Sequence, residues 1–127
     1  MTDFVDTDVL IDHARSHPGA RKAIEEATRR ERRLFGSVVT KAEFLAGLRD
    51  DVPQVTDLLD SIEWMPVTDE IAERAGSLAR EYPRPGVRFA IADYLIAASA
   101  QLLSARLLTR NVRHFPMFPD LEAPYAL

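Results

Sequence analysis

Three acidic residues occur beside or within apolar stretches of the sequence, where a solvated surface residue is not expected. Asp6 directly follows a short apolar stretch, Glu43 comes soon after a second one, and Asp93 interrupts a segment that is otherwise apolar. A buried carboxylate is costly unless it is paired, hydrogen-bonded or bound to a metal ion. Carboxylate oxygens suit hard divalent cations, and Mg²⁺ typically binds one or two of them together with waters and substrate phosphates. We therefore expect these acids to hold Mg²⁺ or Mn²⁺ for the hydrolysis of a phosphodiester.

Each acid also has an explanation that involves no chemistry. Asp6 or Asp8 would serve as the N-cap of the following helix, a position that Asp favours. Thr40 and Glu43 match a capping box, in which the Glu side chain turns back to the Thr backbone amide. Asp93 would reach solvent from the start of its helix. Residue types and spacing alone leave these alternatives open.

A polar segment that follows the last apolar run adds neutral and basic candidates. Thr109 offers a hydroxyl and Asn111 an amide oxygen, and Asn111 would bind a metal ion through water. Arg110 and Arg113 would contact phosphate, whose geometry a guanidinium matches, although arginines after a strand are more often plain surface residues. His114 is a candidate general base, but an isolated loop histidine usually has no such role.

Composition narrows the chemistry. The chain has 127 residues, which suits one domain spanning 1–127 with its own core. It contains no cysteine, so a disulfide framework, a thiolate-bound metal and a cysteine nucleophile are excluded. The first residues lack the basic start and apolar run of a signal peptide, and no apolar stretch reaches membrane-spanning length. We expect a soluble cytoplasmic protein that has no membrane partner.

The overall charge counts against nucleic-acid binding. The 16 basic and 20 acidic residues give a net charge of −4, which disfavours broad electrostatic attraction to a nucleic acid. All basic residues except Lys22 and Lys41 are arginines, which suit phosphate better than lysine does. A compositional bias toward arginine explains this equally well.

Apolar runs and amphipathic segments predict the elements that position these residues. A helix is expected to start near residue 9, and the long segment 88–104 is apolar nearly all round, which predicts a buried central helix. The proline-rich tail with Leu121 and Tyr125 is expected to add a short edge strand and a packed terminus. The expected strands cover residues 3–5, 34–39, 63–67 and 106–109, and the other expected helices cover 20–33, 40–48, 55–62 and 71–79, the last after an N-cap at Thr68.

Strands that alternate with helices require crossover connections, which predict an α/β fold with a mainly parallel sheet covered on both faces. Sites in such sheets form beyond the carboxyl ends of the strands. This rule places Asp6, the turn 40–43 and residues 109–111 along one rim of the sheet.

Four separated segments resemble the PIN-domain nucleases, specifically the VapC toxins of VapBC toxin–antitoxin modules. They follow the family's order, span nearly the whole chain and cover residues 5–11, 40–48, 91–100 and 108–115. The resemblance implies a three-layer α/β/α sandwich and Mg²⁺- or Mn²⁺-dependent endoribonuclease activity on RNA. It also implies homodimerisation and inhibition by a cognate VapB-like antitoxin that covers the site.

The resemblance carries the family's principal acids onto Asp6, Glu43 and Asp93, which we expect to be catalytic and to bind the metal ion. The last site position of the family is often acidic and matches Asn111 here, with His114 at a nearby position that is also often acidic. We take Asn111 as the candidate fourth ligand.

Further polar residues are expected to support these ligands. Asp8 stands where the family commonly has Asn or Ser, so it adds a charge near the site. Thr40 and Thr109 are the other expected supporting residues, and Arg110 and Arg113 the expected contacts to the RNA phosphate.

Two other classes of function compete with the nuclease. The run Asp6-Thr7-Asp8-Val9 also resembles the nucleophile motif of haloacid-dehalogenase-like phosphatases. That family needs a downstream lysine and a late acidic pair, whereas the only lysines here are Lys22 and Lys41, and the late segment offers Asn111 in place of paired acids. A receiver-like phospho-switch lacks its late lysine here as well. The non-enzymatic alternative is a PIN-like module with a degraded site that binds RNA or protein. Asn111 and the acidic balance favour it, whereas the intact Asp6, Glu43 and Asp93 argue against it.

Overall fold

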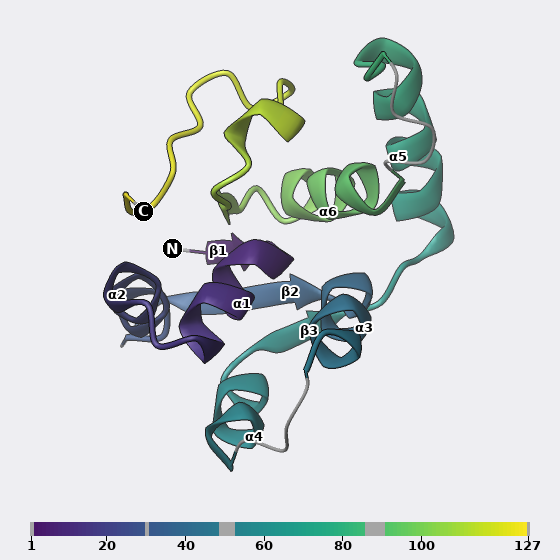
Figure 1. Ribbon diagram of the computed structural model, residues 1–127. Coiled ribbons are helices and arrows are strands. Elements are labelled where there is room, and N and C mark those ends of the chain that lie inside the picture. Colours follow the sequence, from purple (N-terminus) through teal and green to yellow (C-terminus); the bar gives the residue numbers. More distant parts are fainter. Residues whose placement is uncertain (1, 30, 49–52, 86–90, 127) are drawn as a thin grey trace.

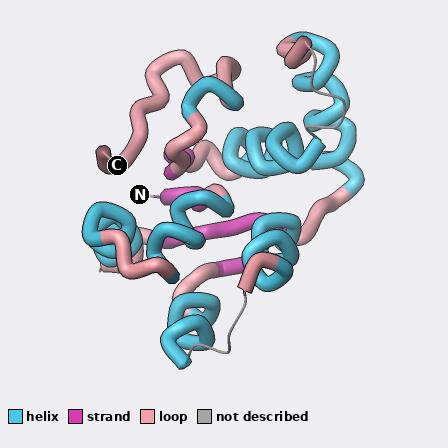
Figure 2. Tube along the Cα trace, in the orientation of Figure 1, coloured by secondary structure: helices cyan, strands magenta, loops and turns pink. Residues whose placement is uncertain are grey.

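In the part of the chain that the structure describes, four strands form one sheet and all run in the same direction, in the order β3-β2-β1-β4. The computed structural model describes residues 2–29, 31–48, 53–85 and 91–126 (Figure 1). Figure 2 shows the strands together in the interior with helices around them. The strands are β1 (Thr2–Val5), β2 (Arg33–Ser37), β3 (Glu63–Met65) and β4 (Arg106–Leu108). The predicted mainly parallel sheet is thus confirmed.

The helices connect successive strands and cover the sheet. They are α1 (Thr7–Ala14), α2 (Pro18–Ala27), α3 (Val38–Ala46), α4 (Pro53–Asp60), α5 (Asp69–Glu81), α6 (Ile91–Leu102) and the short 3₁₀ helix η1 (Val112–His114). None of the described helices is both long and apolar enough to cross a membrane.

Neighbouring residues of each strand point to opposite faces of the sheet, and this alternation divides the core in two. Phe4 and Leu107 pack with the buried residues of α5 and α6 on one face. Val5 and Leu108 pack with residues of α1 to α4 on the other. The result is the expected three-layer α/β/α sandwich.

The central helix α6 explains why an apolar segment carries one acid. Its buried residues pack against α5 and the sheet, and they include Tyr94, Ile96, Ala97, Ala98 and Ala100. Asp93 lies in its first turn, so the acid stands at the end of the helix rather than in its buried middle. The first residues of the predicted helix, 88–90, lie outside the described residues.

Several predicted boundaries are wrong, each for a local reason. The helix predicted over 20–33 ends at Ala27, because the Thr28 hydroxyl donates hydrogen bonds to the carbonyls of Ile24 and Glu25 at the helix end. The strand predicted over 34–39 ends at Ser37, whose hydroxyl accepts a 3.1 Å hydrogen bond from the Val39 amide and caps α3.

The C-terminal tail forms no strand within the described residues, so the expected edge strand is wrong. The tail packs instead: Tyr125 donates a 2.6 Å hydrogen bond to Asp12 of α1, and its ring lies against that of His17. The N-cap predicted at Thr68 is confirmed by its hydrogen bond from the Ile71 amide.

Candidate active site

The carboxyl ends of three neighbouring strands place buried polar residues side by side. Asp6 follows β1, Ser37 ends β2 and Thr109 follows β4, and all three side chains are buried. Parallel strands bring their carboxyl ends to one edge of the sheet, so residues 103 positions apart in sequence meet there. The rim expected from the sequence is present.

Asp6 is held at this edge by hydrogen bonds to both carboxylate oxygens. Oδ1 accepts from the Thr7 amide at 2.8 Å, and Oδ2 accepts from the Thr109 hydroxyl at 2.7 Å. Burial, reinforced by the nearby Asp8 carboxylate, raises the pKa of Asp6 to about 7, and Asp93 adds to this in the same direction. Asp6 is also the N-cap of α1, so the capping explanation is correct but does not account for its burial among acids.

Asp8 closes the turn after β4. Its Oδ2 accepts hydrogen bonds from the backbone amides of Arg110 and Asn111 at 2.9 and 3.2 Å. Its Oδ1 is buried and has no hydrogen-bond partner among the residues that the structure describes. Burial raises the pKa of Asp8 above its ordinary value, although the amide of Arg110 opposes this. Asp8 therefore shapes the last turn of the rim and leaves one oxygen unsatisfied.

Glu43 is joined to the rim by a hydroxyl that sequence reasoning did not single out. The Thr7 hydroxyl donates a 2.7 Å hydrogen bond to Oε1 of Glu43. The capping-box explanation is wrong, because α3 begins at Val38 and its N-cap is Ser37, which leaves Thr40 buried within the first turn. Glu43 is exposed in the next turn and faces the start of α1.

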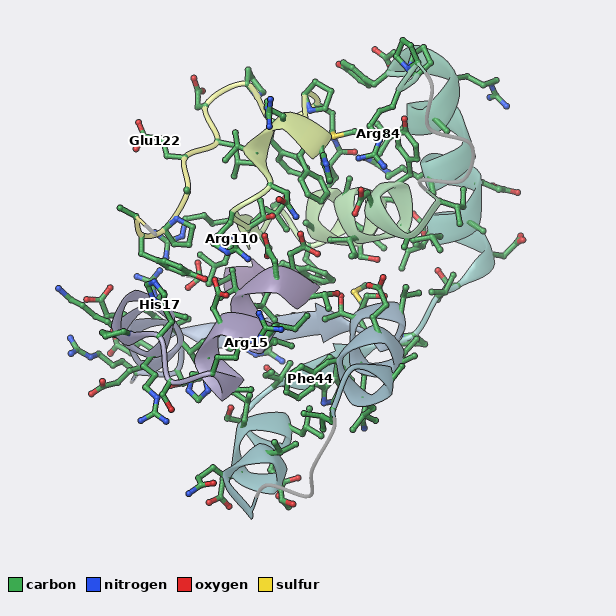
Figure 3. The ribbon with its side chains drawn as sticks, viewed as in Figure 1. Arg15, His17, Phe44, Arg84, Arg110 and Glu122 are labelled. Atoms are coloured by element: carbon green, nitrogen blue, oxygen red, sulfur yellow. The ribbon has the colours of Figure 1, made fainter. Side chains whose placement is uncertain are left out.

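Asp93 is engaged by two basic side chains. Oδ2 lies 2.9 Å from Nη1 of Arg84 and 3.3 Å from Nδ1 of His114. Arg84 comes from the segment after α5, and His114 from η1. Figure 3 shows Arg84 in the space between α5 and the C-terminal segment. Asp93 thus lies where three separate parts of the chain meet.

The two arginines expected to contact phosphate lie in different settings. Arg110 lies between α1 and the C-terminal tail (Figure 3), where its Nε is 2.5 Å from Oδ2 of Asp12. Arg113 is exposed on η1. Asn111 is exposed, and its backbone amide also donates to the Thr109 hydroxyl at 3.1 Å. The proposed phosphate-binding role of both arginines stays a prediction.

Asp3 is a second buried acid, it lies within β1, and its charge is compensated by arginines. Asp3 is 1% exposed, and its oxygens lie 2.9 Å from Arg32 and 2.9 Å from Arg106. Asp6 has no such cationic partner among the described residues. The acid at the amino end of β1 is therefore neutralised within the chain, whereas the acid at the carboxyl end is not.

The donor set fits a hard divalent cation that is completed by water and substrate. Asp6 and Asp8 are acids with raised pKa values, and one oxygen of Asp8 is unsatisfied. Over residues 2–29, 31–48, 53–85 and 91–126, no three acidic or histidine side chains form a ready-made cage. Mg²⁺ needs only one or two carboxylates when waters and phosphate oxygens fill its remaining positions.

Four residues at or near the rim were missed by sequence reasoning. Thr7 had a signal, since a hydroxyl between two acids at a strand end is well placed to bridge. Ser37 also had one, as a good N-cap residue at the end of an apolar run. Arg84 and Asp12 had none, because their partners are set by the packing of distant segments.

The sequence profile of the PIN domain matches residues 4–119 of this chain. Ribonuclease VapC10 of Mycobacterium tuberculosis (strain ATCC 25618 / H37Rv) is 44% identical over 125 residues, covering 98% of this chain and 93% of that protein. Ribonuclease VapC19 of the same strain is 39% identical over 123 residues, covering 96% and 98%. A chain from a toxin-antitoxin complex of Klebsiella pneumoniae has a TM-score of 0.82 at 27% identity, over 98% of this chain and 99% of that one.

Proposed function

Because the chain belongs to the PIN-domain family, we propose that it is a metal-dependent ribonuclease and the toxin of a toxin–antitoxin pair. Its relatives of 39% and 44% identity are named ribonucleases and are matched over nearly their whole length. The Klebsiella pneumoniae structure is a toxin-antitoxin complex with the same fold. These likenesses support the reaction class, the RNA substrate and a VapB-like antitoxin partner.

Within this proposal, the chain's acids hold Mg²⁺ or Mn²⁺ at the carboxyl edge of the sheet. Asp6 and Asp93 would be the principal ligands, Glu43 would be a further one, and Asn111 would bind the ion through water. A divalent ion held by these residues would supply polarisation of a phosphoryl oxygen and activation of a water molecule for attack on phosphorus. The raised pKa of Asp6 supports this assignment, because an uncompensated buried carboxylate favours binding a cation.

The remaining residues of the rim orient these ligands. The Thr109 hydroxyl and the Thr7 amide fix the Asp6 carboxylate from both sides. The Thr7 hydroxyl fixes Glu43, which is exposed and so placed to contact water or RNA. Asp8 and Thr40 support the surrounding turns, and Arg110 and Arg113 are assigned to the RNA phosphates.

The observation that carries the proposal is the difference between Asp3 and Asp6. Asp3 lies within β1 and Asp6 directly follows it, and both are buried, yet only Asp3 is paired with arginines. A fold keeps an uncompensated buried acid where function needs it, since removing such a group is usually favourable to stability.

The direct test is cleavage of total bacterial RNA by the purified protein with Mg²⁺, with Mn²⁺ and with EDTA. We expect cleavage with either ion, none with EDTA and none by Asp6→Asn. The matched control is Glu122→Gln, which removes a carboxylate that projects from the C-terminal tail into solvent (Figure 3). Wild-type protein that binds RNA without cutting it would contradict the enzyme and favour the degraded binding module.

The toxin assignment has its own test in cells. Expression in the bacterial cytoplasm, where we place the protein, is expected to arrest growth, and Asp93→Asn is expected to relieve the arrest. Co-expression of the small protein encoded beside this gene, which we expect to be the antitoxin, should restore growth. Unimpaired growth with soluble wild-type protein would contradict the assignment as a toxin.

The family resemblance also implies that the protein is a homodimer, and light scattering in solution measures its oligomeric state.

A further inference from the structure

Arg84 is the least exposed of the arginines that form ion pairs in the described part of the chain. Its side chain is 17% exposed, against 25% for Arg32 and 26% for Arg110. It comes from the loop between α5 and α6, yet its guanidinium turns inward to the first turn of α6. A surface arginine of a loop has no need of such burial, so the position of Arg84 requires an explanation.

The Arg84 guanidinium is only partly satisfied where it lies. Nη1 is 2.9 Å from Oδ2 of Asp93, but Nε is buried and has no hydrogen-bond partner among the described residues. A guanidinium carries five N–H donors in a planar fork, which suits two oxygens of one oxyanion. Arg84 therefore has donor capacity that Asp93 alone does not use.

Arg84 and a divalent cation compete for the same carboxylate. Asp93 shares Oδ2 between Arg84 and His114, and a cation bound to this carboxylate would repel the guanidinium at close range. An arginine displaced from Asp93 stays tethered beside the site. The anion that RNA cleavage brings to that place is a phosphate, which carries one negative charge as the carboxylate does.

We propose that Arg84 is a phosphate-binding residue that rests on Asp93 in the free protein and moves to an RNA phosphate when a divalent cation occupies that carboxylate. The inference rests on the proposed ribonuclease function and deepens it. It makes Arg84 a competitor of the metal ion and a partner of the substrate, so removing it has opposite effects on the two.

The test compares wild type with Arg84→Gln and Arg84→Lys. The control is Arg74→Gln, which removes an exposed arginine that contacts Gln101, about 12 Å along α6 from Asp93. Mn²⁺ binding is measured without RNA by electron paramagnetic resonance. Cleavage of total bacterial RNA is measured under single-turnover conditions over a range of protein concentrations, which separates binding of RNA from the maximal rate. Circular dichroism and the unfolding midpoint establish that each variant is folded.

Arg84→Gln is expected to bind Mn²⁺ about fivefold more tightly, because a competing cation is removed. The protein concentration for half-maximal cleavage is expected to rise about tenfold, the loss of one charge-assisted contact. Arg84→Lys keeps the charge but not the fork, so its Mn²⁺ affinity stays near that of wild type while its RNA binding is weakened. Arg74→Gln changes neither quantity.

Unchanged or weaker Mn²⁺ binding by folded Arg84→Gln would overturn the competition at Asp93. If Arg84→Gln binds RNA as tightly as wild type does, the phosphate contact is overturned. If Arg84→Gln does not fold, the same result with Arg84→Lys overturns it. Wild-type protein that cuts no RNA would overturn the proposed function and the phosphate contact together, whereas the Mn²⁺ measurement would still decide the competition.

Discussion

The Thr109 hydroxyl donates a 2.7 Å hydrogen bond to Oδ2 of Asp6, and so joins the ends of β4 and β1 across 103 residues of sequence. Thr109 is fully buried and Asp6 nearly so. A buried hydroxyl that holds one carboxylate oxygen leaves that side chain a single orientation. The orientation of the central acid is therefore set jointly by the residue that follows the neighbouring strand and by the first amide of its own helix.

Thr109→Val should separate this orientation from packing, because valine has nearly the same shape and no donor. We expect a loss of about 1 kcal/mol in the free energy of unfolding, typical of one hydrogen bond, together with weaker Mn²⁺ binding. Thr109→Ser keeps the hydroxyl and should bind Mn²⁺ as wild type does. Denaturant unfolding and Mn²⁺ titration measure the two effects, and equal Mn²⁺ affinity in the valine and serine variants would contradict this role.

Thr7 and Glu43 are expected to act as one unit. Thr7→Val removes the donor that holds Oε1 of Glu43, and should slow RNA cleavage while changing stability little, because Glu43 is exposed. A double-mutant cycle with Glu43→Gln, read as cleavage rate, tests the coupling. The loss caused by Thr7→Val should be much smaller in the Glu43→Gln background, and fully additive losses would show that the contact has no role in the reaction.

The raised pKa of Asp6 makes the metal-free protein less stable at higher pH. The pKa is about 7 in the folded state against an ordinary value of 3.8, so folding favours the protonated acid. This contribution to stability is fully present below pH 4 and is lost as pH rises through 7. In EDTA, the unfolding midpoint of wild type should therefore fall between pH 5 and pH 8 relative to that of Asp6→Asn. Parallel curves for the two proteins would contradict the shift.

Asp3 is expected to contribute to stability and not to metal binding, the opposite of what we expect for Asp6. Asp3→Asn leaves the Arg32 and Arg106 guanidiniums without their shared carboxylate, and we expect a loss of about 2 kcal/mol in stability, discounted for the exposure of both arginines. Mn²⁺ affinity should not change, because Asp3 lies at the other end of β1. Thermal unfolding measures the loss of stability, and Mn²⁺ titration measures the affinity. Weakened Mn²⁺ binding by folded Asp3→Asn would contradict the purely structural role of Asp3.

The rim of the site could be predicted because parallel strands bring their carboxyl ends together. Asp6 and Thr109 each follow an apolar run, and that local pattern is enough to place both at one edge of the sheet. The three-layer fold follows in the same way from alternating apolar runs and amphipathic segments.

The contacts of the site were less accessible from the sequence. Both Ser37 and Thr40 are good N-cap residue types, and both are buried. What decides between them is that β2 ends at Ser37, whose hydroxyl accepts the hydrogen bond from the Val39 amide. This three-residue shift of the N-cap removes the capping box, and Glu43 contacts Thr7 instead. Arg84 has no periodic pattern around it, so its pairing with Asp93 depends on how α5 and α6 pack.

The most direct test of the site is anomalous X-ray diffraction at the manganese edge from crystals of the protein grown with Mn²⁺. We predict one or two anomalous peaks in contact with the carboxylates of Asp6 and Asp93, and their loss in crystals of Asp6→Asn. A peak bound to other residues, or one that persists unchanged in the variant, would contradict the assignment of the metal-binding site to the carboxyl edge of this sheet.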